Sequence, residues 1–224
     1  MAALSMRGIS LELKKQHPRV WKGAWAVGVA ILAMGVAVLF YSSMLLPWHT
    51  RWGTVGNEAT TTLPGDSLVA HPKTRSTRAV TIAAPPSRIW PWIAQMGHGR
   101  GALYSYDWLE NLVGCDMHSA ESIHPEWQNI QPGDKVGLGP EGYPAYPVVD
   151  VMPGHALVLG AQDIQSWVFV LMPQADGTTR LLVRSQGDYE PTAFNFFIWK
   201  VMTQPLHFVM ERKMLLGIRE RAER

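Results

Sequence analysis

The longest apolar stretch of the chain runs from residue 23 to residue 46, GAWAVGVAILAMGVAVLFYSSMLL, and contains no charged residue. A helix of this length covers about 36 Å at about 1.5 Å per residue, whereas a hydrocarbon core is about 30 Å thick. A cleaved signal peptide has a shorter apolar region and a small-residue cleavage site. The pattern therefore predicts an uncleaved transmembrane helix over residues 23–48. Amphipathic rings suited to the headgroup level flank it at Trp21, Trp25, Tyr41 and Trp48.

The charges on the two sides of this helix differ. Residues 1–22 form a basic tail with five Lys or Arg and one Glu, and only Arg51 follows the helix closely. Cations near a span favour the cytoplasmic side. We therefore expect a single-pass protein of the cell membrane with a cytoplasmic N-terminus and an extracytoplasmic domain. The rest of the chain is slightly acidic, so nucleic acid is not an expected partner.

After the span, residues 49–77 are rich in Thr, Pro and Gly and show no helical or strand period, which predicts a tether. A folded domain over residues 78–224 follows. It opens with a strand, because Val80 and Ile82 alternate with smaller or polar neighbours. Pro85-Pro86 ends that strand and opens a helix. The apolar residues at helical spacing in that helix are Ile89, Trp92, Ile93 and Met96, and Gly97 is its expected end.

A second helix is predicted over residues 105–114, capped by Ser105, with one apolar face. Short strands separated by turn signals follow, and a helix begins near Thr192. Pro205 is expected to divide this last helix into an aromatic first part, FNFFIWKVM, and a regular second part. The order of elements indicates an α+β fold. The apolar positions used are Trp108, Leu109, Leu112 and Val113 in the second helix, and Leu206, Met210, Met214 and Ile218 in the last.

Several segments resemble a known family: APPSRIWPWIAQMGHGRGALYSYDWLEN, IHPEWQ, TRLLVRS and HFVMERKMLLGIRERAE. They are similar to the SRPBCC superfamily of START-like, helix-grip domains, which includes polyketide cyclases and lipid carriers, and to its bacterial subgroup with an N-terminal membrane helix. The resemblance covers about residues 50–224. It implies a seven-stranded antiparallel sheet wrapped around a long C-terminal helix, with an apolar cavity between them. It implies no reaction, because the superfamily hosts enzymes and pure binders on one scaffold.

The stretch MGHGRGALYSYDWLENLVGCDMHSA, residues 96–120, concentrates groups that could carry chemistry. Its histidines and carboxylates lack the close spacing of zinc ligands, and its serines lie outside a G-x-S-x-G elbow. General acid–base chemistry remains an alternative. We expect no catalytic residue, metal or cofactor, and interpret GHGRG as the mouth of a pocket where Arg100 meets an anionic headgroup or Asp107. The groups considered are His98, Asp107, Glu110, Asp116, His118, His124 and Glu126, with Ser105 and Ser119.

The abundance of tryptophan, tyrosine and methionine favours a cavity walled by large apolar side chains. We therefore predict a membrane-anchored protein that binds a hydrophobic small molecule or lipid. The alternatives are a cyclase- or hydrolase-like enzyme on the same scaffold, and a structural or regulatory partner of a membrane complex. We further hypothesise that residues 194–202 dip into the membrane surface and gate the pocket. The expected ligand-binding residues are Trp92, Met96, His98, Arg100, Tyr104, Tyr106, Trp108, Trp167, Met210 and Met214.

Overall fold

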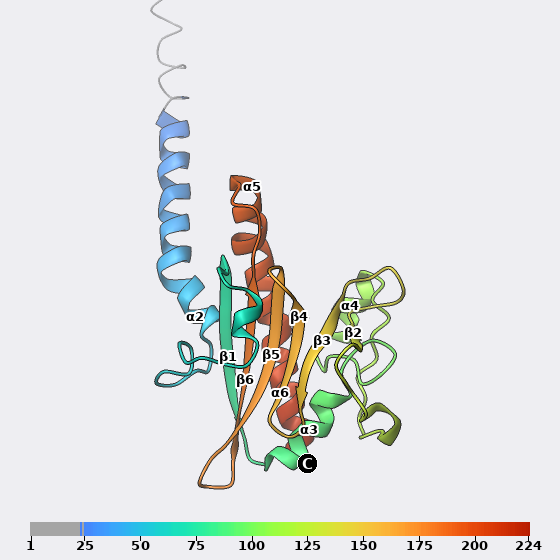
Figure 1. The fold of residues 1–224 in the computed structure, drawn as a ribbon. Coiled ribbons are helices and arrows are strands. Elements are labelled where there is room, and N and C mark those ends of the chain that lie inside the picture. Colours follow the sequence, from blue (N-terminus) through green and yellow to red (C-terminus); the bar gives the residue numbers. More distant parts are fainter. Residues whose placement is uncertain (1–22, 24) are drawn as a thin grey trace, which may run out of the picture. The chain divides into compact units, whose positions relative to one another are not determined.

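The computed structural model describes residue 23 and residues 25–224 (Figure 1). The basic tail of residues 1–22, on which the expected orientation rests, lies outside the described residues. The chain divides into two compact units, Met1–Pro47 and Trp48–Arg224. We describe each unit by itself.

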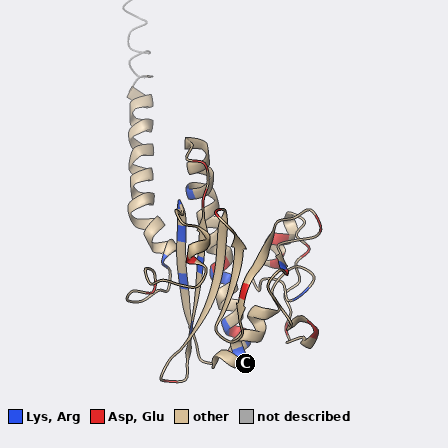
Figure 2. Ribbon diagram, viewed as in Figure 1, with Lys and Arg blue, Asp and Glu red and all other residues tan. Residues whose placement is uncertain are grey.

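A single helix is long and apolar enough to cross a membrane among the described residues. It covers Trp25–Thr50, its most apolar 18 residues have a mean hydropathy of 2.3, and it carries no charged side chain (Figure 2). Its last turns are a π-helical segment, η1 (Tyr41–Leu45), and α2 (Leu46–Thr50). Length and composition thus agree with the predicted transmembrane helix, and by these measures it is a candidate span.

The second unit is built on an antiparallel sheet with the strand order β1-β6-β5-β4-β3-β2. The described residues form six strands, one fewer than the resemblance implies. The first strand begins at Thr74, inside the segment expected to be a tether, and Val80 and Ile82 face the main core as their period predicts. The strands are β1 (Thr74–Ile82), β2 (Lys135–Gly137), β3 (Ala145–Met152), β4 (Ala156–Ala161), β5 (Gln165–Pro173) and β6 (Thr179–Gly187).

The helices lie mainly against one face of this sheet (Figure 1). The C-terminal stretch is helical from Ala193 to Glu223 without a break, so Pro205 does not divide it. A π-helical segment precedes the proline, and the N–H of Gln204 donates to the carbonyl of Trp199, which widens the turn where the proline lacks a donor. The elements are η2 (Asp66–Leu68), α3 (Pro86–Ala94), α4 (Asp107–Leu112), η3 (Pro125–Trp127), α5 (Ala193–Phe196), η4 (Phe197–Thr203) and α6 (Gln204–Glu223).

The main core lies between the inner face of the sheet, α3 and α6. Burial on α6 recurs at intervals of three and four residues, as expected for one face of a helix. The buried row is rotated from the predicted one, because Leu206 is 57% exposed while Glu211 is buried. The predicted α+β layout of an antiparallel sheet gripping a long C-terminal helix is confirmed. The buried residues of α6 are Phe208, Glu211, Met214, Leu215, Gly217, Ile218 and Ala222.

The opposite face of the sheet is covered by the segment expected to be a tether. Leu63 belongs to a second apolar cluster on this face. Arg184 of β6 donates to Asp66 (Nη1–Oδ2 2.6 Å), and Arg180 donates to Glu58 (Nη2–Oε2 2.6 Å). Residues 49–77 are therefore packed and ion-paired rather than free. Their Thr, Pro and Gly content reflects an irregular path over the sheet and not an extended linker.

Candidate functional site

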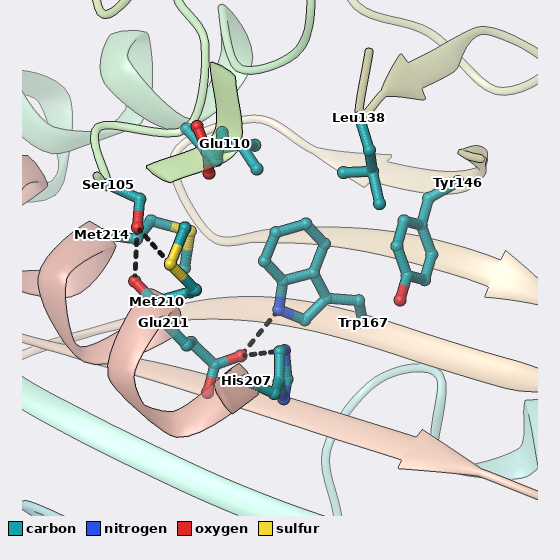
Figure 3. A pocket seen from close by; sticks show the side chains of 10 residues that line it. Ser105, Glu110, Leu138, Tyr146, Trp167, His207, Met210, Glu211 and Met214 are labelled. Carbon is teal, nitrogen blue, oxygen red and sulfur yellow. Dashed lines mark hydrogen bonds and ion pairs between the residues drawn. The ribbon is translucent and has the colours of Figure 1, made fainter. Parts of the chain in front are cut away.

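A cavity of about 110 Å³ lies between the inner face of the sheet, α6 and the residues around α4 (Figure 3). Apolar side chains form most of its wall. Its polar groups come from Ser105, Glu110, His207 and Glu211, with the Tyr146 hydroxyl and the Trp167 indole N–H. Ligand pockets usually combine an apolar lining with a few placed polar groups. The remaining lining residues are Leu103, Leu138, Tyr146, Trp167, Met210 and Met214.

The α6 side of the cavity holds Glu211 in a full set of hydrogen bonds. Its Oε1 accepts from Trp167 Nε1 (2.8 Å) and from Ser185 Oγ (3.1 Å), and its Oε2 accepts from Arg78 Nη1. The side chains of Arg78 and Glu211 are fully buried. His207 Nε2 lies 3.5 Å from Glu211 Oε1. A buried charge is tolerated when it is paired and hydrogen-bonded in this way.

These contacts fix the charges of the α6 side. Burial acts to raise the pKa of Glu211, but Arg78, His207 and the hydrogen bonds from Arg78 and Trp167 outweigh it and hold that pKa below its ordinary value. Burial also lowers the pKa of His207, against the attraction of Glu211 and with the repulsion of Arg78. The network therefore consists of a carboxylate, a guanidinium and a neutral imidazole at neutral pH.

The other side of the cavity carries Glu110, a residue of α4, in a very different environment. No hydrogen bond or ion pair of its carboxyl group is found among the described residues, and its Oε2 is buried without a partner. Burial, followed by the repulsion of Asp107, raises the pKa of Glu110 to about 7. Figure 3 shows Glu110 well separated from Glu211, with no interaction drawn to it. One cavity thus holds one fixed carboxylate and one carboxyl group that titrates near neutrality.

Of the predicted ligand-binding residues, Trp167, Met210 and Met214 line this cavity. Tyr104, Tyr106 and Trp108 instead line a separate, polar groove of about 380 Å³. Ser105 borders both spaces. It does not cap α4, whose first flanking residue is Tyr106, and its Oγ donates to the carbonyl of Met210 (2.9 Å). The predicted set is therefore divided between two neighbouring spaces.

The remaining predicted residues lie away from the cavity. Trp92 and Met96 belong to the main core. Arg100 donates to the backbone carbonyls of Ala94 (3.1 Å) and Trp127, and no ion pair joins it to Asp107 among the described residues. The glycine-rich loop is held by paired backbone hydrogen bonds between Gly97 and Ala102, both 3.0 Å. The loop is therefore held by backbone hydrogen bonds, and residues at its two ends belong to the main core.

His98 also belongs to this region. Its Nε2 lies 3.8 Å from Asp116, whose carboxylate is also 3.0 Å from Nε2 of the exposed His118. No group of three or more His, Cys, Asp or Glu residues that could hold a metal occurs within residue 23 and residues 25–224. His124 and Glu126 pair with one another 3.2 Å apart. Asp107 accepts hydrogen bonds from the backbone N–H and the hydroxyl of Ser119, both 2.7 Å.

The Arg78–Glu211 pair was not predicted from the sequence, although each residue lies in phase with the buried apolar residues of its own element. Arg78 is in phase with Val80 and Ile82 on β1, and Glu211 is in phase with Leu215 and Ile218 on α6. A charged residue in phase with an apolar row is a signal for a buried polar network. The role of Glu110 has no such signal, because its burial depends on how the loops around α4 fold back.

Comparisons with known proteins find distant structural similarity only. No protein-family model matches the chain, and no curated protein matches it. Similar solved structures include a polyketide-cyclase-like protein of Corynebacterium glutamicum (15% identity, 65% of this chain and 88% of that chain, TM-score 0.34). Another is a protein of Nitrosomonas europaea (11%, 71% and 97%, TM-score 0.42). A third is the Aha1 dimer of Colwellia psychrerythraea (16%, 67% and 95%, TM-score 0.34).

Proposed function

We propose that this chain is a membrane-anchored protein that binds a small apolar molecule in the cavity between the sheet and α6. The observation that carries the proposal is the cavity itself, whose wall is mostly apolar and includes Trp167, Leu138 and two methionines. Apolar cavities of comparable size, about 150 Å³, stay dry and bind small aromatic molecules. The polyketide-cyclase-like and Aha1-like neighbours are consistent with a binding role.

The cavity volume restricts the kind of ligand. Pockets for drug-sized ligands usually measure about 300–1,000 Å³. A volume of about 110 Å³ suits a single ring or the end of an acyl or isoprenoid chain. The remainder of a longer lipid would extend past the α4 side, where Trp108 is 65% exposed and Leu112 is 72% exposed. We therefore propose a ligand with one buried apolar end.

The membrane part of the proposal rests on the candidate span and on the residues that follow it. Trp48 directly follows Pro47 and stacks edge-on against Phe208 of α6, with ring centroids 5.2 Å apart. Arg78 Nε donates to the carbonyl of His49 (2.8 Å). These contacts hold the first residues of the second unit against β1 and α6. An apolar ligand partitions into the bilayer, so an anchored pocket meets it at high local concentration.

The decisive experiment identifies what the protein carries. The detergent-purified full chain is extracted with organic solvent, and the extract is examined by mass spectrometry beside that of Leu138→Trp, which fills the cavity from its wall. Ile164→Trp, at an exposed turn, is the matched control. A compound present in wild type and Ile164→Trp but missing from Leu138→Trp supports the proposal. Identical extracts from all three, with all three folded, contradict it.

The side of the membrane is tested separately. The imbalance of cations around residues 23–46 favours an extracytoplasmic domain. Alkaline phosphatase fused after Arg224 should then be active in a bacterial host, because that enzyme requires an oxidising compartment. A green fluorescent protein fused at the same position should stay dark. The reverse result would place the domain in the cytoplasm and leave the cavity proposal intact.

One observation favours an enzyme as the second candidate. The cavity holds two carboxyl groups whose environments separate their pKa values, which is a common arrangement for acid–base catalysis. In an enzyme, Glu110 would be the proton donor, because Glu211 is held ionised. The extracts decide between the two: Glu110→Gln would retain a substrate whose mass differs from the compound in wild type. The same compound in both variants supports binding without turnover.

A further inference from the structure

Glu110 is the one cavity residue whose polar group is buried without a protein partner. Ser105 donates to the carbonyl of Met210, and His207 and Trp167 contact Glu211. The Tyr146 hydroxyl has no hydrogen bond among the described residues, but it is not one of the fully buried atoms without a partner. Glu110 has no cation and no hydrogen-bond donor among the described residues. A buried polar group without a partner costs free energy that a ligand group can recover. Its position on the cavity wall therefore indicates contact with the ligand.

The protonation state decides what Glu110 can recognise. Burial and the neighbouring Asp107 raise the pKa of its carboxyl group to about 7, and an apolar ligand that displaces water raises it further. The neutral acid carries one O–H donor, whereas the carboxylate only accepts. A bound apolar ligand therefore meets a hydrogen-bond donor. The titratable or charged groups around Glu110, from every wall of the cavity and its surroundings, are Asp107, Cys115, Tyr146, His207 and Glu211.

The pKa values of Glu211, His207, Tyr146 and Cys115 are all shifted away from neutrality. Glu211 stays ionised and His207 stays neutral, because the pKa of each is lowered. The pKa of Tyr146 is raised by burial and by Glu211, and the pKa of Cys115 is raised by burial and by Glu110. Glu110 is the cavity residue whose pKa is shifted toward neutrality instead.

We propose that Glu110 donates a hydrogen bond from its carboxyl O–H to an oxygen acceptor, a carbonyl or hydroxyl oxygen, on the apolar ligand of this cavity. The proposal rests on the proposed binding function and names the chemical class of the ligand: apolar molecules with one buried oxygen, rather than pure hydrocarbons or cations. A cationic ligand would require the ionised form, and its binding would have the opposite dependence on pH.

Two probes of matched shape test this assignment, acetophenone and ethylbenzene, which differ by one carbonyl oxygen. The full chain is labelled with ¹³C at its methionine methyl groups and studied in lipid nanodiscs by NMR. Met210 and Met214 line the cavity and report occupancy directly. At pH 6, acetophenone should bind about three- to tenfold more tightly than ethylbenzene, which corresponds to one hydrogen bond. At pH 8.5 this preference should disappear.

Three variants separate Glu110 from its surroundings. Glu110→Gln keeps an N–H donor and loses the titration, so the preference for acetophenone should persist at both pH values. Glu110→Leu removes the donor and should bind both probes equally. Glu126→Gln changes an exposed carboxyl group outside the cavity and should leave the preference and its pH dependence unchanged. Thermal unfolding of each variant verifies that it is folded.

The outcomes distinguish this inference from the function on which it rests. If neither probe shifts the Met210 and Met214 methyl signals, the cavity does not take small apolar molecules, and both proposals fail. If both probes bind equally to wild type at pH 6, or if Glu110→Leu keeps the preference, the cavity binds apolar molecules and the role of Glu110 is overturned. Binding of acetophenone that tightens as the pH rises also overturns it.

Discussion

The sheet-and-α6 wall of the cavity and the two short helical segments near it, α4 and α5–η4, use similar residues in opposite ways. The wall buries Glu211 with every polar contact satisfied, whereas α4 carries Glu110 with none. Leu215 and Ile218 of α6 are in the core, whereas Phe196 and Phe197 of α5–η4 are 47% and 50% exposed. Composition alone therefore does not separate structural residues from those that are free to contact a ligand or a membrane. Unmet contacts do.

The largest expected effect lies in the satisfied wall. Arg78→Met leaves the carboxylate of Glu211 buried without its cation, and breaking a buried pair in this way costs about 3–5 kcal/mol. Arg75→Met, on the same strand, removes an exposed ion pair with Asp66 and should cost less than about 1 kcal/mol. Urea unfolding of both variants in detergent measures the difference.

The double variant Arg78→Met/Glu211→Leu sharpens this prediction. Removing both charges avoids the unpaired carboxylate, although Trp167 and Ser185 lose their acceptor. The double variant should therefore be less destabilised than Arg78→Met alone. If Arg78→Met unfolds with the same free energy as Arg75→Met, the pair is not the structural centre that its burial indicates.

The next effect is a pH dependence that belongs to Glu110. Its pKa is raised on folding, so the folded protein holds a proton that the unfolded chain releases. Stability should therefore fall as the pH rises from the ordinary glutamate pKa through about 7. Glu110→Gln should remove this fall, which is worth roughly 1–2 kcal/mol after allowance for partial exposure. Unfolding free energies measured from pH 5 to pH 8.5 provide the comparison.

A control variant at another glutamate shows whether the fall of the unfolding free energy with pH belongs to Glu110. The carboxyl group of Glu126 is exposed and its pKa is lowered, mainly by its own backbone N–H and by His124. Its titration lies below this pH range, so Glu126→Gln should leave the slope unchanged. A wild-type stability that does not fall between pH 5 and pH 8.5 would show that Glu110 has a partner or lies in water.

The same contrast explains what the sequence could predict. Period-two alternation located β1 through Val80 and Ile82, and an uncharged run located the helix that covers Trp25–Thr50. Helical spacing located α6 but in a rotated register, because Leu206 was taken as its first buried residue. Local periods are set by the backbone, so they could be read from the sequence. Which face of α6 is buried depends on tertiary packing, and local periods carry no information about that packing.

The site was less predictable for the same reason. Trp167, Met210 and Met214 line the cavity because they belong to regular elements whose inner faces the pattern reveals. Trp108 and Leu112 looked like a buried face of a helix and are exposed. Arg100 looked like an anion-binding residue and is held by backbone carbonyls. Loop residues are placed by long-range contacts, so their spacing in the sequence says little about what they face.

The smallest effect on stability is expected at α5–η4, where the exposed rings make the strongest contrast with α6. Phe208, which contacts the ring of Trp48, lies just beyond η4, so this surface lies close along the helix to the point where the candidate span joins the domain. Rings this close to an anchor can insert into the interfacial region of a bilayer. At about 25 cal/mol per Å², burying several of them would contribute a few kcal/mol of membrane affinity. The exposed apolar residues are Phe194, Phe196, Phe197, Trp199, Met202 and Leu206.

The test uses a chain that begins at Trp48, because this residue opens the second compact unit and its ring contacts Phe208. We expect it to float with vesicles of phosphatidylglycerol and phosphatidylethanolamine. Phe196→Ser/Phe197→Ser should abolish flotation and change the free energy of unfolding by less than about 1 kcal/mol, since partly exposed rings contribute little to the core. Val149→Ser/Ile164→Ser, at an exposed position of β3 and in an exposed turn, should still float. A truncated wild type that never floats would leave a protein partner as the occupant of this surface. Unfolding of the phenylalanine variant would show that the rings belong to the core, and the contrast with α6 would then be lost.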